Sequence, residues 1–165
     1  MKPRLWFWVP AVLGLVADLV SKHYVFATLS RHPDQRVEVF GSWLVLCLQQ
    51  NRGGVFGILQ GKGYIFIALT VVALGVVVWM LRQAQAQQRL VPLALGLMVA
   101  GALGNLYDRL FIGHVRDFIY VEAIRYPAFN IADTCICIAA GLLILGVFRE
   151  PAKTDGADES PAAAA

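Results

Sequence analysis

Hydrophobic positions along the chain gather in four long runs that carry almost no charge. They cover residues 5–26, 64–81, 90–106 and 131–148, and each has about the 17–25 residues that a membrane-spanning helix needs. A helix of this length crosses the hydrocarbon core of a bilayer, which is roughly 30 Å thick. Because that core offers no water to an open backbone, the pattern predicts four transmembrane helices.

The first run follows two basic residues, Lys2 and Arg4, as the apolar part of a signal peptide would. No small-residue cleavage pattern comes after it, and three further runs do, so we expect this run to remain as a helix. Four spans place both ends of the chain on one side of the membrane. Basic residues are almost equally frequent on the two sides, so the distribution of charge does not select the orientation.

The segments between the runs are less regular, and the longest covers residues 27–62. Within it, β-branched and aromatic residues at 37–40 and 43–48 flank a turn at Gly41, which predicts a β-hairpin. This segment is too apolar to stand free in water, so we expect a small sheet that rests on the membrane surface. A second segment, residues 108–130, lies on the same side.

Composition supports a single membrane-embedded domain over residues 1–150. Apolar residues make up 58% of the 165 positions and charged residues 15%, which excludes a disordered chain and is untypical of a soluble domain. The formal net charge is +3 and the basic residues are scattered, so we expect no nucleic-acid partner. Residues 151–165 combine Pro, Gly, charge and Ala, and we expect a disordered tail there.

Several polar residues fall inside the apolar runs or at their ends. An ionisable group in the membrane costs about 2.5–3.5 kcal/mol, so such residues indicate a function. Asp18 and Lys22 are four residues apart in the first run and share a helix face, and we interpret them as a structural ion pair. Asn105 and Arg109 have the same spacing at the end of the third run, where Arg109 could hold a carboxylate.

Two acids, Asp117 and Asp133, lie at one membrane face at the two ends of a loop that leaves this face and returns to it, so they can meet. Two carboxylates in a dry site cannot both ionise readily, and they titrate as a pair. Aspartic peptidases use such a pair: one carboxylate takes a proton from water while the other gives one to the carbonyl oxygen. Two solvated acids at the interface are the alternative.

Two other classes of membrane protein also fit these polar residues. A proton-coupled carrier would place its charges near the middle of the membrane, often in repeated halves, whereas these lie at one face and show no repeat. A scaffold protein would use its polar residues only to hold helices together. His23, His32 and His114 lack the spacing of metal ligands, so we expect neither a metal nor another cofactor.

Five short motifs together resemble the bacterial lipoprotein signal peptidase family, the type II signal peptidases. Each motif alone is a weak signal, but all five occur in the order typical of that family. They are DLVSK at 18–22, NRGGVFG at 51–57, GNLYDR at 104–109, GHVRDF at 113–118 and FNIAD at 129–133.

The resemblance implies an α-helical integral membrane protein with four transmembrane helices, a small extracytoplasmic β-sheet cradle and a short extracytoplasmic helix or loop. It implies an aspartic endopeptidase of the bacterial inner membrane, with both termini in the cytoplasm and the active site at the extracytoplasmic face. Such an enzyme removes the signal peptide of prolipoproteins by cutting before the diacylglyceryl-modified cysteine of the lipobox. Its partners would be these substrates and the phospholipid bilayer, and we expect a monomer.

The matching motif positions also imply a role for individual residues. Asp117 and Asp133 match the catalytic pair, and Asp18 and Lys22 match a pair that supports the fold. Gly54 stands where the family usually has Ala. The positions that line the site and position the substrate are matched by Asn51, Gly53, Asn105, Arg109, Asn130 and Ala132.

Overall fold

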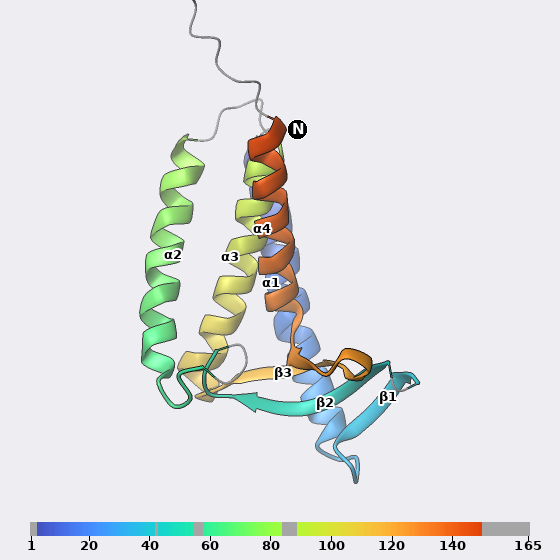
Figure 1. The fold of residues 1–165 in the computed structure, drawn as a ribbon. Helices are drawn as coiled ribbons and strands as arrows, with labels where there is room; N and C mark the ends of the chain where they lie inside the picture. The colour runs from blue at the N-terminus through green and yellow to red at the C-terminus, as the bar shows by residue number, and fades with distance from the viewer. Residues whose placement is uncertain (1–2, 42, 55–57, 84–88, 150–165) are drawn as a thin grey trace, which may run out of the picture.

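Four helices form the body of the molecule in the computed structural model (Figure 1). They are α1 (Pro3–Leu29), α2 (Gly63–Gln83), α3 (Leu90–Tyr107) and α4 (Ile131–Arg149), one for each predicted run. By length and composition, α1, α2 and α3 are apolar enough to cross a membrane, and the apolar part of α4, Ile131–Gly146, is shorter. The structure describes residues 3–41, 43–54, 58–83 and 89–149. Lys2, residues 55–57 of the second motif and the tail at 151–165 lie outside this range.

Helix α3 is the central helix of the bundle. Figure 1 shows α1 and α4 beside it and α2 on its outer side. A Cβ atom at Gly96 would lie 2.3 Å from the backbone oxygen of Phe7, and one at Gly101 would lie 2.3 Å from that of Ala132. Glycine at these two positions therefore lets α1 and α4 pack directly against α3.

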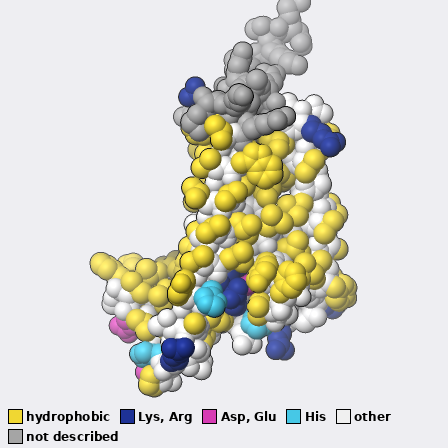
Figure 2. All heavy atoms as spheres, turned by 180° about the vertical axis from the view of Figure 1, so that it is seen from behind, with side chains coloured by type: hydrophobic (Ala, Val, Ile, Leu, Met, Phe, Trp, Pro, Cys, Tyr) yellow, Lys and Arg dark blue, Asp and Glu magenta, His cyan; other side chains and the backbone are white. Residues whose placement is uncertain are grey.

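Apolar side chains cover the outside of the helical body, and the charged side chains gather toward its ends (Figure 2). On α2, for example, Val72, Val76 and Trp79 are exposed. Such a surface is unfavourable in water and suits the acyl chains of a bilayer.

A four-stranded antiparallel sheet lies across one end of the bundle (Figure 1). Its strands are β1 (Arg36–Phe40), β2 (Leu44–Asn51), β3 (Val115–Val121) and β4 (Tyr126–Phe129), in that spatial order. β1 and β2 form the predicted hairpin. The second segment, where we expected a short helix or loop, contributes β3 and β4, and its helical parts are a π-helical turn at its start and a 3₁₀ turn at Glu122–Ile124 between the strands. Pairing of β3 with β2 is a contact distant in sequence, which no local pattern reveals.

Helix α3 continues beyond Tyr107 as one π-helical turn, η2 (Asp108–Ile112). The backbone N–H of Gly113 donates to the backbone oxygen of Asp108 at 2.9 Å, and Gly113 ends the turn at a φ of 83°. Glycine adopts this left-handed conformation without steric cost. The turn leaves Asp108 fully buried, and the chain enters β3 two residues after Gly113.

Candidate active site

Asp117 lies in the middle of β3, where the strand crosses the end of the helical bundle. Its side chain is almost fully buried, because alternate residues of β3 point toward the helices. The side-chain amides of Asn51 and Asn130 donate to its two carboxylate oxygens, at 3.0 and 2.7 Å. Asn51 is the last residue of β2, so the pairing of β2 with β3 places this amide beside the acid.

Asp133 lies in the first turn of α4, where free backbone N–H groups favour a negative charge. Its Oδ1 accepts a hydrogen bond of 2.8 Å from the Asn105 side chain, and its Oδ2 accepts one of 3.2 Å from the Asn130 backbone. Asn105 comes from the last turn of α3. The close packing of α3 on α4 therefore fixes this second acid.

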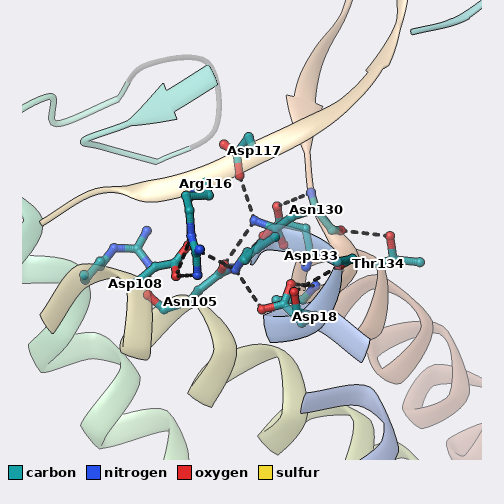
Figure 3. Close-up of polar contacts among 12 residues, drawn as sticks. Asp18, Asn105, Asp108, Arg116, Asp117, Asn130, Asp133 and Thr134 are labelled. Carbon is teal, nitrogen blue, oxygen red and sulfur yellow. Dashed lines mark hydrogen bonds and ion pairs between the residues drawn. The ribbon is translucent and has the colours of Figure 1, made fainter. Parts of the chain in front are cut away.

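Asn130 joins the two acids and has no exposed surface. Its Nδ2 donates to Asp117 at 2.7 Å and to Asn105 at 3.1 Å, while its Oδ1 accepts the backbone N–H of Asp133 at 2.9 Å (Figure 3). One buried carboxamide thus contacts both acids. The structure brings together the two acids that the sequence could place only at the same membrane face.

The two acids influence each other electrostatically. Burial, and after it the charge of Asp133, raises the pKa of Asp117 from 3.8 to about 7, against the hydrogen bonds from Asn51 and Asn130. Near neutral pH the pair therefore holds about one proton, shared between two coupled groups. This protonation state allows one carboxylate to accept a proton while the other carboxyl group donates one.

A second buried network lies directly beneath the acids. The Lys22 ammonium is 2.8 Å from Asp18 and 3.4 Å from Asp108, and Arg116 is 2.7 Å from Asp108. Asp18 also accepts the backbone N–H of Ala132 at 2.8 Å, which ties α1 to the start of α4. The expected pairing of Asp18 with Lys22 is present in the structure.

Asp108 and Arg116 were not among the site residues expected from the sequence. Both lie inside the motifs GNLYDR and GHVRDF, but the sequence assigned neither of them a role. Their pairing depends on the π-helical turn, which directs Asp108 inward, and on β3, which places Arg116 opposite it. The hydropathy pattern signals neither feature.

Arg109 connects α3 with the loop after β2. Its guanidinium donates to the backbone oxygens of Gly53 and Asn105, at 3.2 and 3.3 Å, and lies 5.0 Å from the centre of the Phe66 ring. Arg109 therefore binds two backbone carbonyl oxygens in this structure. Its partner Gly53 must be glycine, because a Cβ atom there would lie 2.6 Å from the backbone oxygen of Ile58.

A cavity of about 620 Å³ opens between the sheet and helices α2, α3 and α4. Asp117, Asp133, Asn105 and Arg109 line one part of it, and apolar side chains line much of the rest. The apolar part from α2 and α3 consists of Phe66, Leu69, Ala73, Met98 and Ala102. Among the described residues, no group of three or more His, Cys, Asp or Glu side chains could hold a metal ion.

The profile of the family described as signal peptidase (SPase) II matches residues 10–149. The chain belongs to the signal peptidase II family. It is 38% identical over 152 residues to the lipoprotein signal peptidase of Alteromonas mediterranea, with 88% of this chain and 81% of the relative covered. It is 37% identical to the lipoprotein signal peptidase of Geobacter sulfurreducens, with 91% and 96% covered.

The fold is also similar to that of solved structures of bacterial membrane enzymes. A bacterial membrane enzyme structure obtained by the in meso method at 2.3 Å resolution is similar, with a TM-score of 0.77 and 31% sequence identity. The match covers 95% of this chain and 93% of that one. As a signal peptidase II the chain is a membrane protease, and the carrier and scaffold alternatives are excluded.

Proposed function

We propose that this chain is an aspartic endopeptidase that removes the signal peptide of a prolipoprotein by cutting before its diacylglyceryl-modified cysteine. The observation that carries the proposal is the buried contact of Asn130 with both Asp117 and Asp133 at the wall of one cavity. Two acids in such a site hold one proton between them, and aspartic peptidases use this arrangement to hydrolyse a peptide bond with water.

In the proposed reaction, the ionised carboxylate takes a proton from a water molecule, whose oxygen attacks the scissile carbonyl carbon. The protonated carboxyl group gives its proton to the carbonyl oxygen, which produces a neutral gem-diol. When the gem-diol collapses, the C–N bond breaks: the carboxyl group that took the proton from water gives it to the leaving nitrogen, and the other carboxylate takes a proton from a gem-diol hydroxyl, which becomes the carbonyl oxygen of the new carboxyl end. The pair then returns to its starting state, so no cofactor is required.

The residues around the pair would hold the substrate. Arg109 and Asn51 line the cavity together with the acids, and they carry N–H groups suited to the carbonyl oxygens of an extended peptide. Gly53 and Ala132 would act through the backbone: the Gly53 oxygen holds Arg109, and the Ala132 N–H holds Asp18. Correct placement of a bound reactant contributes a large part of the rate enhancement of an enzyme.

The apolar part of the cavity suits a substrate that is itself anchored in the membrane. Phe66, Leu69 and Met98 lie on the helices beside the acids, so an acyl chain or an apolar peptide segment could extend along them. Binding energy from these remote groups can be used to position the scissile bond. With both termini in the cytoplasm of the bacterial cell, the acids would lie at the extracytoplasmic face of the inner membrane. We propose that one chain acts alone.

The experiment is cleavage of a diacylglyceryl-modified prolipoprotein by the purified protein in detergent. We expect wild type to cut and Asp117→Asn and Asp133→Asn to be folded but inactive. Asp34→Asn is the matched control, because Asp34 is an exposed acid that is distant in sequence from both Asp117 and Asp133. A wild-type protein that cuts no modified substrate, or a dyad variant that cuts at the normal rate, contradicts the proposal.

A further inference from the structure

Lys22 is a charged residue with no exposed surface, placed in the second half of α1. Besides its ion pair with Asp18, its ammonium donates a hydrogen bond of 3.0 Å to Oδ1 of Asn105. An ammonium group carries only donors, so it can face only the oxygen of a carboxamide. The contact therefore fixes which way the Asn105 amide points.

The orientation of the Asn105 amide determines which of its atoms faces Asp133. With Oδ1 of Asn105 turned to Lys22, its Nδ2 faces Asp133 and donates at 2.8 Å. The same Oδ1 also accepts Nδ2 of Asn130 at 3.1 Å, and that Nδ2 donates to Asp117 as well. The carboxylate of Asp133 thus receives an N–H group whose direction traces back to Lys22, and the same Asn105 oxygen supports the donor to Asp117.

The other amides of the site are oriented in the same sense by obligate donors. The backbone N–H of Asp133 faces Oδ1 of Asn130, and the backbone N–H of Gly53 faces Oδ1 of Asn51. A flip of Asn105 would break this order, because it would turn its NH2 group toward the Lys22 ammonium and Asn130 Nδ2, and its oxygen toward the carboxylate of Asp133. Lys22 is thus the part of the network that holds Asn105 against such a flip.

We propose that Lys22 is a positioning residue for the reaction, which acts through Asn105 to keep an N–H donor on Asp133 and which places its own positive charge near the pair. This inference rests on the proposed function, since it concerns how the same two acids share a proton. It differs from a purely structural role of the Asp18–Lys22 pair, which would hold α1 in place and leave the chemistry unaffected.

Several charged or titratable groups face the acids from the neighbouring elements. Lys22 from α1, Cys47 from β2 and Arg109 from η2 act on the acids themselves. Asp18 from α1, Asp108 from η2 and Arg116 from β3 belong to the network around Lys22. Asp108 is already paired with Arg116. Removal of the Lys22 charge therefore leaves Arg109 as the cation directed at the pair among the described residues, and the pKa of Asp117 should rise.

The test compares Lys22→Met with Asp18→Asn in the cleavage assay, with kcat, KM and the pH profile of kcat/KM measured for each. Both variants break the same ion pair, but only the first removes the donor to Asn105. For Lys22→Met we expect kcat to fall about 10–100-fold, as for other supporting hydrogen bonds of catalytic groups. We expect its acid limb to move up by about one pH unit, because a cation has been lost. For Asp18→Asn we expect the limbs to stay in place or move to lower pH.

Lys22→Met leaves the acids Asp18 and Asp108 without their shared partner and could prevent folding. In that case the comparison is made between Asp18→Asn/Lys22→Met and Asp18→Asn/Lys22→Gln, which have the same charge and differ in the donor. We expect the glutamine double variant to have at least several-fold higher kcat. Equal kcat values and equal pH profiles in the two variants overturn the inference.

Failure of the inference and failure of the proposed function give different results. If wild type cuts, Asp117→Asn is inactive and Lys22→Met keeps the wild-type pH profile, the role of Lys22 is only structural and the dyad stands. If wild type does not cut, or Asp117→Asn cuts normally, the proposed function itself fails.

Discussion

Asn130 Nδ2 lies 2.7 Å from Oδ1 of Asp117, and both side chains are buried beneath the sheet. The bond joins the residue that precedes α4 to the middle of β3. It therefore couples the position of one acid to the packing of the helix that carries the other. The geometry of the acid pair depends on how the sheet sits on the bundle, and on neither element alone.

Replacement of Asn130 tests this coupling. Asn130→Ala removes a donor from Asp117, the acceptor of the Asp133 N–H and a donor to Asn105. We expect kcat to fall by about 10²-fold or more, as when a preorganised donor is removed from an active site. The measurement is single-turnover cleavage in detergent, with the fold checked by the melting temperature.

Thr134→Val is the matched control for Asn130→Ala. The Thr134 hydroxyl bonds the backbone oxygen of Asn130 at 3.0 Å, in the same helical turn. Its loss disturbs the local backbone without removing a donor from either acid. We expect activity within a few-fold of wild type, and an equal loss in both variants would show that only the integrity of the α4 start matters.

The raised pKa of Asp117 predicts how stability and activity depend on pH. Burial, then the charge of Asp133, raises this pKa to about 7, so between about pH 4 and 7 the folded protein binds more protons than the unfolded chain. The free energy of unfolding should therefore decrease as the pH rises through this window. Activity should fall above about pH 7, where the pair loses its proton.

The pH dependence is measured by the melting temperature in detergent at a series of pH values, for wild type, Asp117→Asn and Asp133→Asn. Asp117→Asn should flatten the dependence, since the titrating group is gone. Asp133→Asn should shift it to lower pH, because the second cause of the raised pKa is removed while burial remains. A stability that increases from pH 4 to 7 in wild type, and equally in Asp117→Asn, contradicts the assignment.

The helices and the hairpin could be predicted from the sequence because local patterns determine them. Runs of apolar residues long enough to cross a bilayer leave the backbone few alternatives to a helix. The hairpin of β1 and β2 followed from β-branched residues around a turn. Asp133 could be singled out because an acid at the start of an apolar run is costly, and Asp117 because the loop that carries it returns to the same membrane face.

The rest of the site depends on contacts between elements distant in sequence. Strand β3 forms by pairing with β2, and Asp108 turns inward because α3 ends in a π-helical turn. The orientation of Asn105 depends on Lys22, which is far away in the sequence. Such features arise from tertiary packing, which overrides local propensity.

The close contact between α3 and α4 predicts a second effect on stability and activity. A Cβ atom at Gly101 would lie 2.3 Å from the backbone oxygen of Ala132, the residue before Asp133. Gly101→Ala should therefore push the start of α4 away and destabilise the protein by about 1–3 kcal/mol. Cleavage should also fall, because Asp133 moves with that turn.

Gly141→Ala is the control for Gly101→Ala: Gly141 lies on α4, where a Cβ atom meets nothing within 4 Å. The melting temperatures of the two variants should differ clearly, and equal values would show that α4 can shift freely.

The last prediction concerns how Phe66 of α2 holds Arg109. The guanidinium lies 5.0 Å from the ring centre, and a Cβ atom at Gly54 would lie 2.8 Å from the same ring. The ring thus fills the space beside Gly54 and supports Arg109 by a cation–π contact worth roughly 0.5–2 kcal/mol. Phe66→Leu should loosen Arg109 and raise KM about 3–30-fold if that energy contributes to substrate binding. Phe111→Leu is the control, since Phe111 is 71% exposed on the neighbouring turn. The measurement is the KM for the modified prolipoprotein, and a KM unchanged by Phe66→Leu would show that the two backbone carbonyls alone position Arg109.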